Sequence, residues 1–531
     1  MGTIRLLFIA ILSAIFCCAR AQDNTYALSK PVAIDQEGWN RVLCMKNGNT
    51  LLFHFQKDRK IVVKVFDSTR REIASQKDDY HILEFRLTDF TIKGVYDIND
   101  EAVLFFDQDI DSRHSLIRIR YNSHTGKLVE EKLLAESKSE NKRMKFYVMK
   151  HKDDENYQVL FCTDMRHPRE SDIFCVFFNN KHESIKEVQL PVDRKIYDDL
   201  EIVGAETHLN GVLITAALTK TEVYGLAGSK APISKESSVD DHFLQFYYIP
   251  MESKNMKSTI VHLSTGVFPY HAYYTFNPFA QTLNVLLFSY KKLLYKFGLN
   301  IQTGTVSRDL FFKIDPQDMS SIGINEIKND TANYFLKKQT DTTRYYGGAP
   351  LKMYTDENGR TTIISETFIQ ASGVNTMNGI GSETFIQMMG ITQVDDNGNE
   401  IFGTVLPLSQ YYNYATSLPR YSGEFMGIHP FPLGRNFYMV YNDYNKNFGN
   451  SLSNPGDTVF NFNITNACYY KMDSKKVVTK HYLFGEPVAN EYKCSFVSGA
   501  DYDKERGVYA TLVQYKKKDG ITLCMGWRKM D

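Results

Sequence analysis

The sequence carries no excess of charge of either sign. Its 531 residues include 62 Lys and Arg against 62 Asp and Glu. Proteins that hold a phosphate backbone present a strongly basic surface, so nucleic acid is not an expected partner. The chain also lacks the cluster of basic residues that an anionic membrane surface attracts.

Long apolar runs are absent after the N-terminus, where one short run occurs. Arg5 precedes the apolar segment 6–16, and Ala19-Arg20-Ala21 places small residues where a signal peptidase cleaves. The apolar segment is shorter than the ~20 residues that span a bilayer. The pattern predicts a signal peptide at residues 1–21 and a mature chain that begins at Gln22. We therefore expect an exported protein with no transmembrane segment, located in the periplasm, on the outer surface or in the medium.

A lipoprotein is the alternative to simple cleavage, because Cys17 and Cys18 end the apolar run. A lipidation site normally requires a small residue before the cysteine, and Phe16 stands before Cys17. The pattern favours cleavage without a lipid.

Cysteine is scarce in the mature chain. None of the six remaining residues lies in C-x-x-C spacing; they are Cys44, Cys162, Cys175, Cys468, Cys494 and Cys524. This count and spacing exclude a zinc finger and a disulfide scaffold. Cys162 and Cys175 flank a polar segment that reads as a hairpin loop. In a symmetric hairpin they would face each other, so they are the candidate disulfide; two buried thiols are the alternative.

Recognisable catalytic motifs are also missing. The sequence has no phosphate-binding loop, zinc-protease helix or nucleophile-elbow motif. Its 13 histidines are scattered. A glycosidase needs two carboxyl groups at a defined separation, and sequence alone does not single out such a pair. We predict no catalytic, metal or cofactor site, and whether the protein is an enzyme is left open.

Alternating apolar and polar residues occur along almost the whole chain. In Leu116–Tyr121, for example, Ile117 and Ile119 alternate with Arg118 and Arg120. A period of two in segments rich in Val, Ile, Phe and Tyr predicts half-buried antiparallel strands. The sequence therefore predicts an all-β protein.

Tight polar turns recur between these strands. They lie at Asp67–Arg70, Asn122–Gly126, Asn179–His182, Glu252–Asn255, Asn300–Gly304, Asp395–Asn399 and Asp473–Lys476. Their mean spacing of about 67 residues fits a unit of four strands. Four-stranded antiparallel units in tandem form β-propellers of 4–8 blades. We predict that residues 22–531 form a single propeller of eight blades, with seven as the alternative.

The two ends of the chain support closure of such a ring. The last unit contains three strands, and Thr25–Ile34 is a spare strand that would complete it and cover two sheet edges. The rival architecture is a pair of stacked β domains that divide near Asp315–Ser321. The presence of only two tryptophans argues against propellers whose blades are built around repeated tryptophans.

Two insertions and two tyrosine clusters are the candidate binding features. Ala371–Gly381 separates two copies of Ser-Glu-Thr-Phe-Ile-Gln and predicts a protruding, mobile hairpin tip, and Asn445–Pro455 predicts a second mobile loop. The clusters at 411–414 and 441–444 offer flat faces with polar tips, although tyrosine is also simply a good strand residue. The candidate binding residues are Asn375, Asn378, Tyr411, Tyr412 and Tyr414.

Part of the chain resembles exported proteins of Bacteroidota. The resemblance covers Gly359–Asn447 and is carried by three features: the phrase GRTTIISETFIQ with its Gly- and Asn-rich insertion, the turn Asp395–Gly398, and the strand phrase NFYMVYNDYNKN. It implies export and a β-propeller-like fold, and it implies no catalytic residues.

These observations favour an exported binding or scaffold propeller that presents rim loops to a glycan, a peptide or a cell-surface protein. Fold alone does not establish a function. The alternative is a carbohydrate-active hydrolase or lyase with carboxylates around the central channel.

Overall fold

The computed structural model describes residues 25–531 except for short gaps. The gaps are 35–37, 57–59, 80–89, 111–112, 138–143, 152, 163–171, 193–195, 198, 209, 224–237, 264–266, 298–299, 341–345, 377–378, 414–424 and 455. The expected signal peptide lies outside the described residues.

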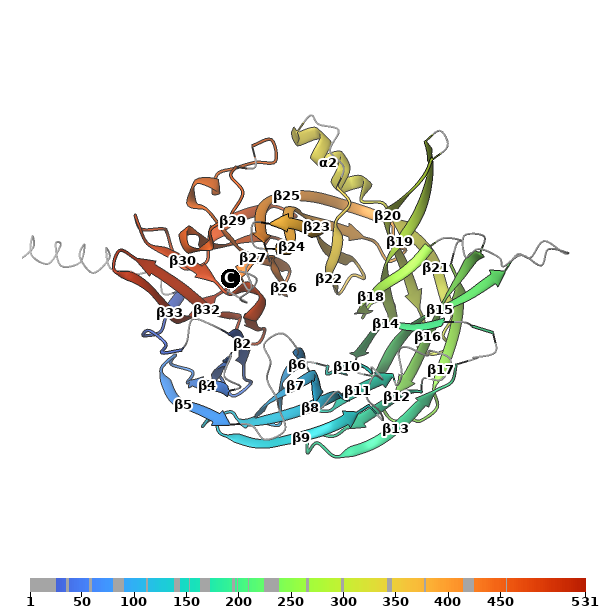
Figure 1. Ribbon diagram of the computed structural model, residues 1–531, viewed down its shortest axis with the longest axis horizontal. Coiled ribbons are helices and arrows are strands. Elements are labelled where there is room, and N and C mark those ends of the chain that lie inside the picture. Colours follow the sequence, from blue (N-terminus) through green and yellow to red (C-terminus); the bar gives the residue numbers. More distant parts are fainter. Residues whose placement is uncertain are drawn as a thin grey trace, which may run out of the picture.

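The described residues form eight antiparallel sheets, seven of four strands and one of five, arranged around a common axis (Figure 1). In chain order, the first seven blades are β2 (Trp39–Cys44), β3 (Thr50–Phe55), β4 (Lys60–Phe66), β5 (Glu72–Asp79); β6 (Phe90–Ile98), β7 (Glu101–Ile110), β8 (Arg113–Asn122), β9 (Leu128–Glu136); β10 (Lys145–Met149), β11 (Tyr157–Cys162), β12 (Ile173–Phe178), β13 (Ser184–Leu190); β14 (Asp199–His208), β15 (Gly211–Val223), β16 (Ser238–Pro250), β17 (Lys257–His262); β18 (Val267–Asn277), β19 (Thr282–Phe297), β20 (Asn300–Ile314), β21 (Ser321–Ile327); β22 (Ala349–Thr355), β23 (Thr361–Thr376), β24 (Gly379–Val394), β25 (Glu400–Asn413); and β26 (His429–Leu433), β27 (Asn436–Asp443), β28 (Asn466–Met472), β29 (Val478–Tyr482). In these seven blades the first strand lies nearest the axis and the fourth lies outermost (Figure 1).

The eighth blade is built from both ends of the chain. It contains β30 (Tyr492–Ser495), β31 (Asp501–Asp503), β32 (Val508–Lys517) and β33 (Gly520–Lys529), and β1 (Tyr26–Leu28) pairs with β33 as the outer strand. Backbone bonds continue past β1, because the Val32 N–H donates to the Leu523 carbonyl at 2.7 Å. The predictions of eight blades and of closure by the N-terminal strand are confirmed. The rival division near Asp315–Ser321 is wrong, because that segment is the turn between β20 and β21 within the fifth blade.

The recurring turns have a common local cause. The side chain of Asp67 accepts the backbone N–H of Arg71 at 3.0 Å, and Arg70 has a left-handed φ of 69°. In the seventh blade Asp473 accepts the N–H of Val477 at 2.9 Å, and Lys476 has a φ of 66°. Asp and Asn favour such turns because their short side chains bond the backbone a few residues further on. These turns are therefore encoded in the local sequence.

One predicted turn is wrong. Asn300–Gly304 lies inside β20, where Gly304 pairs with Leu293 of β19. The third-to-fourth turn of the fifth blade starts at Asp315, whose carboxylate accepts the N–H of Gln317 at 2.7 Å. The segment 300–304 resembles the true turn at 122–126, but its partner strand holds it extended.

The middle strands are buried on both faces, not half-buried as their alternation predicts. All six residues of β3 are buried, and in β8 the side chain of Arg118 is only 1% exposed. Arg118 is enclosed because the third blade covers the face on which it lies, and it donates to the hydroxyl of Tyr157 at 2.6 Å and to Glu130. Buried charge is tolerated there because it is paired and hydrogen-bonded.

Tyrosines link neighbouring blades near the axis. Hydroxyls on the first strands donate to carbonyls on the first strand of the following blade: Tyr96 to Val148 at 2.9 Å, Tyr147 to Ile202 at 2.7 Å, Tyr273 to Pro350 at 2.5 Å and Tyr354 to Pro430 at 2.7 Å. These bonds give part of the abundant tyrosine a structural role. Each of the four bonds joins the first strands of two adjacent blades.

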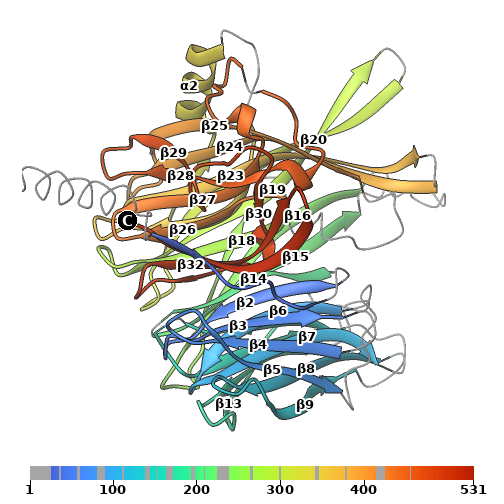
Figure 2. The same cartoon turned by 90° about the vertical axis from the view of Figure 1, so that its left-hand side faces the viewer.

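The hairpins of the fourth, fifth and sixth blades are longer than the rest. β15–β16, β19–β20 and β23–β24 run for 13 to 16 residues per strand, and Figure 2 shows the last two projecting from the body. In β23–β24 the pairing continues to Thr376 and Gly379. The predicted hairpin is present, but the loop expected over Ala371–Gly381 is paired strand except at the tip, 377–378, which lies outside the described residues.

The candidate disulfide has the wrong register. Cys162 of β11 pairs with Ile173, and Cys175 of β12 pairs with Leu160, so the two cysteines lie diagonally and not opposite each other. Both side chains are buried thiols in the part of the chain that the structure describes. The strand pairing is centred one residue earlier in the sequence than the midpoint between the two cysteines, so equal spacing about that midpoint misplaced them.

A helix interrupts the connection between the fifth and sixth blades. α2 (Asp330–Thr340) packs Ala332 and Leu336 against Val405 of β25. No helix among the described residues is long and apolar enough to cross a membrane.

Candidate functional site

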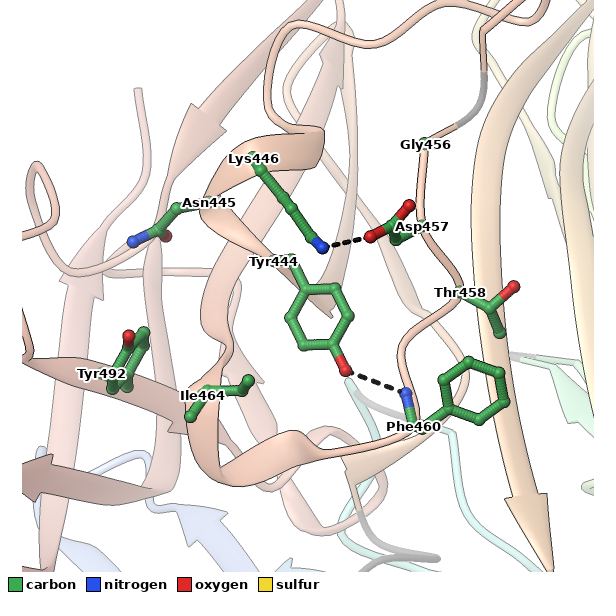
Figure 3. Close-up of a pocket in the computed structure, with 9 residues that line it drawn as sticks. All are labelled: Tyr444, Asn445, Lys446, Gly456, Asp457, Thr458, Phe460, Ile464 and Tyr492. Carbon is green, nitrogen blue, oxygen red and sulfur yellow. Dashed lines mark hydrogen bonds and ion pairs between the residues drawn. The ribbon is translucent and has the colours of Figure 1, made fainter.

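The candidate site is a pocket formed by the insertion between β27 and β28 in the seventh blade (Figure 3). Its volume is about 680 Å³, within the range of small-molecule sites. The lining residues are Tyr444, Asn445, Lys446, Gly456, Asp457, Thr458, Phe460, Ile464 and Tyr492. Second-to-third connections of all blades emerge on the same face of an antiparallel propeller, so this pocket shares its face with the long hairpins.

Asn447 holds the two limbs of the insertion together. Its amide nitrogen donates to the carboxylate of Asp443 at 2.8 Å and to the Asp457 carbonyl at 2.7 Å. Its amide oxygen accepts the Asp457 N–H at 3.0 Å. The side chain is 4% exposed, so water competes little for these bonds. The sequence predicts a mobile loop over Asn445–Pro455; its described residues are instead tied to the blade.

A buried ion pair anchors the insertion from below. Lys480 of β29 lies 3.0 Å from the Asp443 carboxylate and donates to the Asn447 carbonyl at 3.1 Å. The two charged side chains are 11% and 9% exposed. The ammonium group also lies 5.3 Å from the ring of Phe448, close enough for a cation–π contact. The base of the pocket is therefore preorganised.

Three aromatic residues are among those that line the pocket (Figure 3). Phe460 is 64% exposed, and Tyr444 and Tyr492 are half-buried. The ring of Phe460 lies 5.3 Å from that of Tyr411, at the end of β25. The backbone there is also fixed, because the Tyr411 N–H donates to the Val459 carbonyl at 3.0 Å. An exposed phenylalanine is thus held in place by a second ring beneath it.

Polar groups face these rings. Lys446 and Asp457 form an ion pair across the mouth, and both side chains are more than 60% exposed. The hydrogen bond that Lys446 donates to the Asp457 carboxylate raises the pKa of Lys446. The hydroxyl oxygen of Tyr444 accepts the N–H groups of Phe460 and Asn461, each at 3.1 Å. The pocket therefore combines apolar faces with donors and one carboxylate.

The predicted binding residues are not brought together. Tyr411 supports Phe460, as described. Tyr412 pairs through its backbone with Thr384, and Asn375 pairs with Ile380 on the long hairpin. Asn378 and Tyr414 lie outside the described residues.

Of the cluster at 441–444, only Tyr444 lines the pocket, while Tyr441 is fully buried. Phe460, Asp457 and Tyr492 were not predicted. The local signal for Asp457 and Phe460 is the polar, Gly- and Asn-rich stretch that precedes them.

The axis of the ring was the predicted location for catalytic carboxylates. The acidic residues of β14 include Glu201 and Glu206, and Lys145 lies 3.0 Å from Glu201. Part of the Glu206 side chain is exposed, but the surrounding protein displaces much of the water near its carboxyl group. This desolvation raises the pKa of Glu206, while the positive charge of Lys352 opposes the shift. Five residues along a strand separate carboxyls by roughly 16 Å. A glycosidase pair needs ~5–10 Å, so these two carboxyls do not form one.

Comparisons with known proteins define no family. No protein-family profile matches the sequence, and no curated protein matches it. Among solved structures, the WD40 domain of SCAP from fission yeast is similar at 9% identity and a TM-score of 0.31, over 95% of this chain and 98% of that one. The polysaccharide lyase Uly1 is similar at 10% identity and a TM-score of 0.32, over 83% of this chain and 90% of that one. A Trypanosoma rangeli sialidase is similar at 9% identity and a TM-score of 0.35, over 90% of this chain and 59% of that one. At these values the similarities indicate nothing about function.

Proposed function

We propose that this protein is an exported binding propeller that captures a glycan in the pocket of the seventh blade. The observation that carries the proposal is the exposed ring of Phe460 beside polar side chains in a preorganised pocket of about 680 Å³. That volume suits one or two sugar residues.

The chemistry of the pocket suits a sugar better than a purely apolar ligand. A pyranose ring presents a face of C–H bonds, which packs on an aromatic ring, and an edge of hydroxyl groups, which need donors and acceptors. Phe460 and Tyr492 supply the first kind of surface, and Asn445 and Asp457 supply the second. Because Asn447 already holds the insertion in place, less conformational entropy is lost when a ligand binds.

The role is binding and not turnover in this proposal. The pocket contains one carboxylate, Asp457, whereas hydrolysis of a glycosidic bond by the usual route needs two. The long hairpins on the same face would extend the surface available to a larger glycan or to a cell-surface protein.

A glycan-array screen with the purified protein, paired with an assay for new reducing ends, tests the proposal. We expect capture of at least one glycan with no release of reducing ends. Phe460→Ala should abolish capture and leave thermal unfolding unchanged. Phe279→Ala is the matched control, since Phe279 is 69% exposed in the turn between β18 and β19 and lies outside the pocket. Equal capture by the Phe460 variant and the parent would overturn the assignment of the pocket.

Export is tested separately by the intact mass of protein recovered outside the cytoplasm. We expect a chain that begins at Gln22 without an added lipid, and a mass that includes residues 1–21 would contradict export by this route.

A further inference from the structure

The free hydrogen-bonding capacity of the pocket consists mainly of donors. Tyr444 is the first case. Its hydroxyl oxygen already accepts two backbone N–H groups, from Phe460 and Asn461. A phenol oxygen has two lone pairs, so the group can only donate its remaining proton. No acceptor for that proton is found among the described residues.

Asn445 is the second case. Its side-chain oxygen accepts the amide of Asn466 at 2.7 Å, and this bond orients the side chain. Its own amide nitrogen carries two N–H groups and has no acceptor among the residues that the structure describes. Tyr444 and Asn445 therefore both offer hydrogens to a ligand.

Lys446 supplies the only ammonium group among the lining residues, and this group is already paired with the carboxylate of Asp457. Both side chains are more than 60% exposed. An exposed ion pair contributes little to stability, because water solvates both charges when they separate. A ligand carboxylate that is held at the same time by the rings and by Tyr444 would displace Asp457 at little cost.

We propose that the preferred ligand is an acidic sugar of the hexuronate type, whose carboxylate takes the place of Asp457 on Lys446 while its ring packs on Phe460. This inference rests on the proposed glycan-binding function and specifies the ligand class. An acidic sugar is rich in acceptors, as the donors of Tyr444, Asn445 and Lys446 require, and a neutral sugar would leave the ion pair unchanged.

The test compares two matched probes by isothermal titration: the β-1,4-linked trimer of glucuronate and the β-1,4-linked trimer of glucose. We expect the acidic trimer to bind at least roughly tenfold more tightly, equivalent to about 1.4 kcal/mol, and to weaken as salt rises. Lys446→Met should remove this preference. Asp457→Asn should tighten binding of the acidic trimer, because the competing carboxylate is gone. Lys475→Met, an exposed lysine in the turn between β28 and β29, is the control and should change nothing.

The outcomes separate this inference from the proposed function. Equal affinity for the two trimers, with loss of both in Phe460→Ala, would overturn the acidic preference and keep the glycan site. No binding of either trimer, with no glycan captured on the array, would overturn both. Equally tight binding of triglutamate would show that the pocket recognises a carboxylate and not a sugar.

Discussion

The indole N–H of Trp527 donates a hydrogen bond to the hydroxyl of Thr50, 3.0 Å away, and both groups are buried. The bond joins β33, the last strand of the chain, to β3 in the first blade. The ring of Trp527 also meets that of Phe66 edge-on, with centroids 5.4 Å apart. These contacts join the eighth blade to the first blade and so help to close the propeller.

Thr50→Val should destabilise the protein while preserving the shape of the side chain. The substitution leaves the buried indole N–H without an acceptor, which costs about 1–3 kcal/mol. The free energy of unfolding from denaturant titration measures the effect. In a double-mutant cycle with Trp527→Phe, the two losses should be less than additive; full additivity would show that the bond does not contribute.

Stability should fall as pH rises through the neutral range because of two buried carboxyl groups. Burial raises the pKa of Asp309 from its ordinary 3.8 to about 8 and that of Glu366 from 4.5 to about 7. Asp309 Oδ1 and Glu366 Oε2 meet no hydrogen-bond partner in the described part of the chain. Between the unfolded and folded pKa values, only the folded state keeps the proton, so each group lowers stability by about 1.4 kcal/mol per pH unit.

Denaturant titrations between about pH 5 and about pH 7 measure this slope. Asp309→Asn and Glu366→Gln should each flatten it. Asp67→Asn should leave the slope unchanged. The backbone N–H of Arg71 lowers the pKa of Asp67, so this carboxyl group is ionised throughout the pH range of the titrations. An unchanged slope in the Asp309 and Glu366 variants would mean that both carboxyls are ionised in the folded protein.

Gly456→Ala should damage the pocket and spare the propeller. Gly456 has a φ of +81°, and an added Cβ would lie 1.8 Å from Asn450 Nδ2 and 2.4 Å from Asn447 Oδ1. We expect loss of glycan capture with little change in the main unfolding transition, since the insertion lies outside the sheets. Gly434→Ala is a matched control, because it has a φ of +57° and nothing within 4 Å. Similar capture by the two variants would show that Asn447 does not shape the site.

Cys162 and Cys175 should be recovered as unbridged thiols. Diagonal positions on paired strands lie roughly 7–8 Å apart, beyond the reach of a disulfide. Burial raises the pKa of Cys175 to about 12, so it should react with alkylating reagents only after unfolding. Peptide mapping under non-reducing conditions is the measurement, and a peptide pair joined through these residues would contradict the register.

The fold could be predicted because interactions between residues close together in the sequence determine many of its turns. Asp67 and Asp473 open turns through bonds to residues four positions ahead, so the turns are visible without knowledge of the partner strand. Where pairing with a neighbouring strand determines the local structure, the prediction from sequence was wrong. Asn300–Gly304 matches the turn at 122–126 residue by residue at three positions, yet β19 holds it in a strand. The alternation of residues in β8 predicts an exposed Arg118, because no local sequence feature indicates that the third blade covers this side chain.

The site could be predicted only in part, since its residues come from separate elements. Tyr444 lies in a tyrosine cluster that the sequence makes visible. Tyr492 is contributed by the eighth blade, and Tyr411 reaches the pocket only by supporting Phe460 from the sixth. These relationships depend on how neighbouring blades are displaced, which no alternation of apolar and polar residues encodes.

The tyrosine links near the axis have an evolutionary consequence. Tyr96, Tyr147, Tyr273 and Tyr354 each donate to a backbone carbonyl, a group that every amino acid possesses. The receiving position can therefore mutate freely without losing its acceptor; in two of the four links it is a proline. A blade duplicated within the gene would bring one donor for its successor and one acceptor for its predecessor. Blade number could thus change by duplication or loss without the simultaneous appearance of complementary side chains.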